Sequence, residues 1–117
     1  MSILLQMEQM PGYLAVRVTG EGAAEEGLQL TELIAEYCKR TNKDKLLIDT
    51  TGLEVKVSLL DRFFLGEIFA RYGIKVAYVC RPEQFDSERF AILVAQNRGV
   101  TIETFTDFQA AEEWLLR

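Results

Sequence analysis

The sequence of 117 residues contains no histidine. Histidine is the usual general base near neutral pH, the partner of serine and cysteine nucleophiles, and the commonest protein ligand of transition metals. Its absence excludes most familiar hydrolase chemistries. Acid–base work by a carboxylate remains open, so a small enzyme that uses Asp49 or Asp61, with a carboxylate-bound Mg²⁺, is one alternative. We otherwise expect no catalytic residue, no metal site and no cofactor, and therefore a protein that is not an enzyme.

Cysteine and proline are also scarce, with two residues of each. Cys38 and Cys80 fall in an expected helix and an expected strand, without the spacing of a disulfide framework or a zinc site. We therefore expect both thiols to be reduced and to lie in the core. Few prolines and no low-complexity tract predict an ordered chain, and the length fits a single domain spanning residues 1–117.

Long hydrophobic runs and an excess of positive charge are missing as well. No segment approaches the roughly 18 uninterrupted apolar residues of a membrane span, and the first ten residues lack the features of a leader, so we expect a cytoplasmic protein. The formal net charge is -5, and the 13 Lys and Arg residues are scattered along the chain. This distribution argues against a nucleic-acid partner, although a local patch could still contact an anionic headgroup.

What the sequence does contain is a regular succession of apolar strands and amphipathic helices. The expected strands are Ile3–Met7, Tyr13–Thr19, Lys45–Asp49, Ile74–Cys80 and Val100–Phe105. The expected helices cover residues 24–40, 58–72, about 85–98, and a last stretch whose capping sequence begins at Thr106. With right-handed crossovers this order predicts an α/β fold. Its mixed sheet has about five strands, with an antiparallel N-terminal hairpin and a parallel remainder, and about four helices cover it.

Four features of this pattern carry a resemblance to a known family. They are Leu46-Leu-Ile-Asp-Thr-Thr-Gly52, the aromatic-bearing helix that follows it, Lys75-Val-Ala-Tyr-Val-Cys80, and the ending from Phe105 to Leu115. On these features the chain resembles the bacterial SpoIIAA-like proteins, also called STAS/SEC14-like, which are small relatives of the anti-sigma factor antagonists. The resemblance implies a SpoIIAA-like fold and a binding or regulatory role.

The same resemblance bears on Ser58. In the anti-sigma factor antagonists, a partner kinase phosphorylates a serine at the start of a helix, and Ser58 lies nearest to that position. The resemblance therefore implies, as an alternative function, a phospho-regulated antagonist of an anti-sigma factor that is switched at Ser58. A phosphate there would be stabilised by the helix dipole. The simpler interpretation is that Ser58 caps the helix, as serine commonly does.

The ends of the third and fourth expected strands supply a candidate ligand site, because ligands of open parallel sheets bind beyond the carboxyl ends of the strands. Two hydroxyls, an accessible backbone, a helix N-terminus and a guanidinium would suit a phosphate or carboxylate there. The residues are Thr50, Thr51, Gly52, Ser58 and Arg81. The alternative is that the threonines hydrogen-bond their own turn and that Arg81 pairs with Glu83 or with solvent.

The expected helix 58–72 has two apolar faces. At about 100° per residue, Leu59, Phe63, Gly66 and Ala70 line one side, and Phe64, Leu65, Ile68 and Tyr72 line the other. One face should pack on the sheet. The second would form a homodimer interface or a lipid-facing groove, unless the adjacent helix buries it. We therefore expect a non-enzymatic binding or regulatory module that binds a protein partner, an apolar-tailed anionic ligand or a membrane surface.

Overall fold

The structure is a computed structural model that describes residues 3–21, 24–54 and 66–117, with the side chains of residues 24 and 25 excepted. Its elements are β1 (Ile3–Met10), β2 (Tyr13–Glu21), α1 (Ala24–Arg40), β3 (Lys45–Glu54), β4 (Lys75–Val79), η1 (Pro82–Gln84), α3 (Phe85–Asn97), β5 (Ile102–Phe105) and α4 (Phe108–Leu115). Residues 66–71 form a further helical segment. No helix in the described ranges is both long and apolar enough to cross a membrane.

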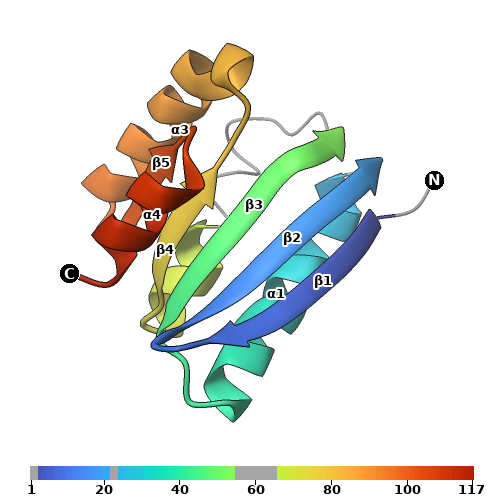
Figure 1. The fold of residues 1–117 in the computed structure, drawn as a ribbon, viewed down its shortest axis with the longest axis vertical. Helices are drawn as coiled ribbons and strands as arrows, with labels where there is room; N and C mark the ends of the chain where they lie inside the picture. The colour runs from blue at the N-terminus through green and yellow to red at the C-terminus, as the bar shows by residue number, and fades with distance from the viewer. Residues whose placement is uncertain (1–2, 22–23, 55–65) are drawn as a thin grey trace.

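The five strands form one sheet in the order β1-β2-β3-β4-β5, with β1 antiparallel to β2 and every later pair parallel. The predicted fold class is confirmed. Each parallel crossover steps to the next strand in the same direction, so right-handed connections place α1, segment 66–71 and α3 on one face of the sheet. Helix α4 follows the last strand and covers the other face, and Figure 1 shows α1 and α4 on opposite sides of the sheet.

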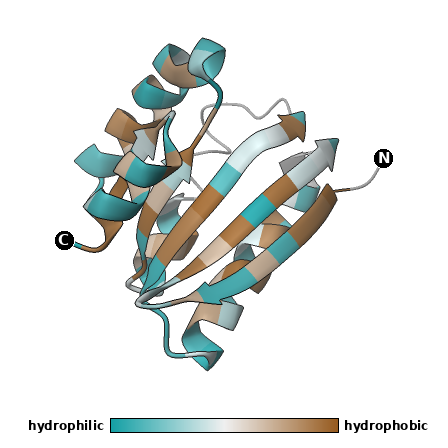
Figure 2. Cartoon of the chain, in the orientation of Figure 1, coloured by the Kyte–Doolittle hydropathy of each residue, from teal (hydrophilic) through white to brown (hydrophobic). Residues whose placement is uncertain are grey.

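Strand alternation divides the interior into two cores. In β3, Leu46 and Ile48 point toward α1 and α3, whereas Leu47 points toward α4, because successive strand side chains alternate between faces. The side chains of these three residues are all buried. Figure 2 shows hydrophobic residues recurring along the strands. The helices carry both hydrophobic and hydrophilic residues, as expected of amphipathic helices that pack on a sheet. Cys38 and Cys80 are both buried, as predicted, and neither is in a disulfide.

Strand β3 is longer than the sequence predicts. The prediction that the strand ends at Asp49 in a turn is wrong, because β3 continues to Glu54 and pairs with β2 from Leu46 to Asp49 and again from Gly52 to Glu54. Between Arg17 and Thr19 β2 advances by two residues while β3 advances by three, from Asp49 to Gly52. The extra residue makes a β-bulge, which changes the direction of the side chains that follow it.

Helix α4 begins one residue later than its capping sequence suggests. The N-cap is Asp107 rather than Thr106, and its carboxylate accepts hydrogen bonds from the backbone N–H groups of Gln109 and Ala110 at 3.3 and 3.2 Å. A carboxylate cap satisfies two N–H groups that have no partner within the helix and is also favoured by the helix dipole. The cap fixes where α4 starts and hence how it lies across the sheet.

A buried hydroxyl also ties α4 to the sheet. The Tyr13 hydroxyl, on β2, donates a hydrogen bond to Glu112 Oε2 on α4. Burial raises the pKa of Tyr13 well above its usual range, and the hydrogen bond to Glu112 and the charges of Glu112 and Glu8 add to the rise. The folded protein therefore holds this phenol in its neutral form at pH values where a free tyrosine ionises.

This contact predicts a loss of stability at high pH. The folded-state pKa of Tyr13 is raised, so its contribution is fully present below the unfolded pKa of about 10 and is lost as pH rises beyond it, by about 1.4 kcal/mol per pH unit. Urea unfolding between pH 8 and 11 measures this loss. Tyr13→Phe should lose stability less steeply than the wild type over that range, and an equal decline would contradict the assignment.

Candidate functional site

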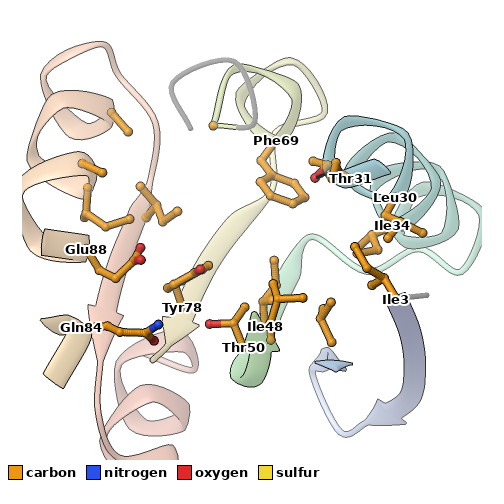
Figure 3. Close-up of a pocket in the computed structure, with 18 of the residues that line it drawn as sticks. Ile3, Leu30, Thr31, Ile34, Ile48, Thr50, Phe69, Tyr78, Gln84 and Glu88 are labelled. Carbon is orange, nitrogen blue, oxygen red and sulfur yellow. Dashed lines mark hydrogen bonds between the residues drawn. The ribbon is translucent and has the colours of Figure 1, made fainter. Parts of the chain in front are cut away.

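A cavity lies on the face of the sheet that α1 and α3 cover, between these helices and the strands, and we call it the α1–α3 pocket. Its volume is about 160 Å³. Most of its wall is apolar, with Ile3, Leu30, Ile34, Ile48 and Phe69 among the lining residues (Figure 3). Ile92 of α3 also lines it. A cavity of about 150 Å³ lined by Leu, Ile and Phe takes up benzene or xenon in another protein. The α1–α3 pocket is therefore large enough for one ring or a short hydrocarbon segment.

Polar side chains interrupt the apolar wall mainly on one side. Figure 3 shows Gln84 and Glu88 extending from η1 and α3 toward Thr50 and Tyr78, which rise from β3 and β4. Glu88 and Thr50 are each only 6% exposed. Thr31, also buried, lines the wall formed by α1. This polar side lies near the carboxyl ends of the parallel strands, where ligands of open α/β sheets bind.

The hydroxyl groups of Thr50 and Thr31 both donate hydrogen bonds to the backbone. Thr50 Oγ1 donates to the backbone oxygen of Val79 at 2.9 Å, and Thr31 Oγ1 donates to the backbone oxygen of Gly27 at 2.7 Å. A hydroxyl has one proton and two lone pairs. Toward any further partner, each of these two hydroxyl groups can therefore act only as a hydrogen-bond acceptor.

The bulge in β3 divides the residues predicted to share one ligand site. Thr50 lines the α1–α3 pocket and, because of the extra residue, Leu53 also returns to that face. Thr51 is exposed and turns to Asp49, whose Oδ1 accepts hydrogen bonds from the Thr51 N–H at 3.0 Å and from Thr51 Oγ1 at 2.7 Å. Thr50 and Thr51 thus belong to opposite faces of the sheet.

Arg81 lies beside the end of β3 but not in the wall of the pocket. Its Nη1 donates to the Thr51 backbone oxygen and to Glu54 Oε1, both at 3.1 Å. Its Nε forms an ion pair with Glu83 Oε1 at 3.1 Å, in a geometry that is not a hydrogen bond. The strand ends do neighbour each other, as expected, and the guanidinium already has two carboxylate partners. Ser58 lies outside the described residues, so anion binding and phosphorylation there stay predictions.

Gly52 closes the bulge against β2. A Cβ atom at this position would lie 2.9 Å from Thr19 Cγ2, which is closer than such atoms normally approach. The branched Thr19 side chain has few rotamers with which to move away. Glycine is therefore required here by the close approach of the two strands.

Gly52→Ala should lower the free energy of unfolding by about 1–3 kcal/mol, the usual cost of forcing extra volume into a packed site. Urea denaturation measures the change. Gly27→Ala is the matched control, because a Cβ there meets nothing within 4 Å and alanine favours the helix by about 1 kcal/mol. Gly52→Ala with wild-type stability would contradict the strand contact.

Two of the four residues predicted to line an exposed apolar face are described. Ile68 is 5% exposed and belongs to the core between the sheet and helices α1 and α3. Tyr72 is half-buried against that core and also lines a shallow polar depression with Lys39 and Lys43. Phe64 and Leu65 lie outside the described residues, so their role at a lipid or dimer surface stays a prediction.

The polar residues that α1 and α3 contribute to the pocket were not predicted from the sequence. Glu88 heads a buried stripe on α3 that continues through Ala91, Ile92 and Ala95. Thr31 heads the same i, i+3, i+4, i+7 spacing on α1, before Ile34, Ala35 and Cys38. A polar residue on an otherwise apolar helix face was the available signal. That the two stripes face one cavity depends on both helices covering the same side of the sheet.

Comparison with known proteins bears on the fold. No protein-family model matches the sequence, and no curated protein matches it. Among solved structures, an uncharacterised protein of the DUF3478 family from Shewanella loihica, described as having a SpoIIAA-like fold, is 25% identical with a TM-score of 0.62. The match covers 97% of this chain and 93% of that one. The chain has a SpoIIAA-like fold.

A second structure agrees with that assignment. An anti-sigma factor antagonist from Mycobacterium paratuberculosis is 18% identical with a TM-score of 0.65, over 97% of this chain and 94% of that one. At this identity the likeness concerns the fold alone. The predicted SpoIIAA-like fold is confirmed, and the α1–α3 pocket lies under α1 and α3, which cover one face of its sheet.

Proposed function

We propose that this protein is a non-catalytic binding module, and that it holds a small apolar molecule, or the ring-sized apolar part of a larger one, in the α1–α3 pocket. The observation that carries the proposal is the partly open, mostly apolar cavity of about 160 Å³ that the residues of the α1–α3 core line. Packed protein interiors contain few voids larger than a water molecule, since such voids lose the contacts of the atoms around them. A ligand would restore those contacts.

We retain the apolar part of the expected ligand rather than its anionic part. Arg81, the cation of the predicted anion site, is not among the lining residues of the pocket and is paired with Glu54 and Glu83. The pocket is also smaller than the 300–1,000 Å³ that is typical of drug-sized ligands. A long acyl chain would need more room than the cavity provides.

A protein partner is the second proposal, and an apolar surface supports it. Phe90 and Leu93 are 60% and 43% exposed on α3, one helical turn apart. Large exposed apolar side chains that cluster can mark protein or membrane contacts. Sedimentation equilibrium and liposome flotation test whether this surface mediates self-association or membrane contact. If the wild type is a monomer without lipid affinity, and Phe90→Ser gives the same result in both assays, the surface has neither role.

The alternative function, a switch at Ser58, is tested separately. Mass spectrometry of the protein isolated from cells shows whether Ser58 is phosphorylated.

Titration with toluene tests the pocket, with the isoleucine, leucine and valine methyl groups followed by NMR. The shifts should concentrate on Ile34, Ile48 and Ile92, which line the cavity. Leu47 and Leu115, which are buried on the other face of the sheet, serve as an internal control and should not move. For a ligand of seven heavy atoms we expect a Kd on the order of 1 mM or tighter. Equal shifts on both faces, or none, would refute the proposed site.

A further inference from the structure

The shallow polar depression beside Tyr72 is a second candidate site. It shares no lining residue with the α1–α3 pocket, and its volume of about 560 Å³ is within the 300–1,000 Å³ typical of ligand sites. Three cations, Lys39, Lys43 and Arg71, line it, and we call it the basic depression. We propose that it binds a small diffusible polyanion that carries a diphosphate or two neighbouring phosphate groups. This inference goes beyond the proposed function and does not depend on it.

The cations meet because two connections from a helix to a strand lie side by side. β3 begins at Lys45 and β4 begins at Lys75, and these two residues are partners in the parallel register. The Lys75 N–H donates to the Asp44 backbone oxygen at 2.9 Å, which ties the connection before β4 to the connection before β3. Arg71, at the end of segment 66–71, therefore lines the same depression as the lysines at the end of α1.

The basic depression combines buried residues with a charged rim. Cys38 and Ile74 are 0% and 3% exposed, whereas Lys39 and Arg71 are exposed. Charges that lie against a protein interior are screened less than charges in open water. A phosphate group held here would therefore be attracted more strongly than one beside an isolated surface lysine.

Cations at helix C-termini often serve the helix itself, by bonding its last carbonyl groups. Here the backbone already supplies those bonds. The oxygens of Tyr37, Cys38 and Lys39 accept N–H groups of the connection that follows α1, at 3.0, 2.8 and 3.2 Å. Segment 66–71 ends with the same pattern of backbone bonds, at 3.3, 3.1 and 3.0 Å. The lysine and arginine N–H groups are therefore not needed to cap these carbonyls.

The interactions that two of these cations make leave them able to bind a phosphate. Lys43 Nζ donates to the Met10 backbone oxygen at 3.1 Å, and an ammonium group has three N–H donors. Arg71 Nη2 pairs with Glu32 Oε1 at 3.3 Å, but both side chains are exposed, and such surface pairs contribute little to stability. A phosphate, which a guanidinium binds in bidentate geometry, can displace that carboxylate.

The wall also contains a carboxylate, Asp44, which opposes anion binding. Three cations outweigh it locally, and at physiological salt charges farther away than about 8 Å are largely screened. The cations of the basic depression therefore matter more to a bound anion than the net charge of -5 on the whole chain. Because the attraction grows with the charge of the ligand, a polyanion fits this wall better than a monovalent anion.

Titration with pyrophosphate at about 0.1 M NaCl tests the inference, with the backbone amide signals followed by NMR. The signals of Lys39, Asn42, Lys43 and Tyr72 should move most, since these residues line the depression. We expect a Kd on the order of 1 mM or tighter. Acetate, which carries a single charge, should bind at least about tenfold more weakly.

Substitutions in the wall assign the binding to named residues. Arg71→Gln and Lys43→Gln should each weaken pyrophosphate binding about three- to tenfold, and Asp44→Asn should strengthen it. Arg40→Gln is the matched control, because Arg40 is exposed next to Lys39 and is not one of the lining residues. It changes the net charge as Arg71→Gln does, and should weaken binding less than about twofold.

Three results would overturn the inference. An equal loss of affinity in Arg40→Gln and Arg71→Gln would show attraction by overall charge without a site. Acetate binding as tightly as pyrophosphate would remove the preference for a polyanion. Association with phosphatidylglycerol vesicles, in the absence of any pyrophosphate binding, would assign these cations to a lipid surface instead. The toluene titration concerns other residues, so the proposed function stands or fails separately.

Discussion

Leu115→Ala is expected to lower the free energy of unfolding by about 2–5 kcal/mol. Leu115 is fully buried at the end of α4, where it packs with Tyr13, Leu47 and Ala111 on the sheet face opposite the pocket. Removing the side chain costs the transfer of its apolar surface and leaves a cavity that the short helix can only partly fill. Because a domain of this size has a total stability of about 5–15 kcal/mol, this is a large fraction.

The neighbouring leucine provides the control for that prediction. Leu116 is 44% exposed and is adjacent in sequence, so Leu116→Ala has the same chemistry outside the core. Its effect should stay within about 0.5 kcal/mol. Chemical denaturation of the two variants measures both values. If the costs are equal, or if the order is reversed, α4 does not pack on the sheet with the face described here.

Gly27→Leu is expected to weaken toluene binding at least about tenfold while leaving the protein folded. Gly27 lines the α1–α3 pocket, and a Cβ added to it meets no atom within 4 Å. A leucine side chain can therefore enter the cavity and occupy the volume that the ligand needs. Burying such a side chain gains about 1.5–3 kcal/mol, and tenfold in affinity corresponds to about 1.4 kcal/mol.

The stability of this variant separates blocking from unfolding. Leucine is a better helix former than glycine by nearly 1 kcal/mol, so Gly27→Leu should be as stable as the wild type or more stable. Gln29→Leu introduces the same side chain at an exposed position of α1 and should leave toluene binding unchanged. Toluene binding by Gly27→Leu with wild-type affinity would show that the ligand does not use this cavity.

Most of the fold could be predicted from the sequence because periodicity reports which faces are buried. The span of α1 agrees with its prediction over residues 24–40, and the hairpin and parallel strands follow from apolar runs of strand length. The end of β3 was mispredicted because Asp49, Thr50 and Gly52 favour turns. Pairing with β2 as far as Glu54 overrides that local preference.

The candidate site could be predicted only in part, since it depends on long-range pairing. Thr50 was identified from its place at a strand end, but the bulge that separates it from Thr51 arises from the register with β2. Arg81 was placed correctly beside this strand end, while one of its two carboxylate partners, Glu54, is 27 residues away in sequence. The contribution of Glu88 depends on α3 lying on the same face as α1, which is a property of the crossovers rather than of any motif.

A crystal structure of the protein under xenon pressure tests most directly whether the core contains a mostly apolar cavity able to accept a ligand. Xenon binds in dry apolar cavities of this size. We predict a xenon atom between Ile34, Ile48 and Ile92, and its loss in Gly27→Leu. A wild-type structure in which these side chains close on one another, or in which ordered water fills the space between them, would contradict the account.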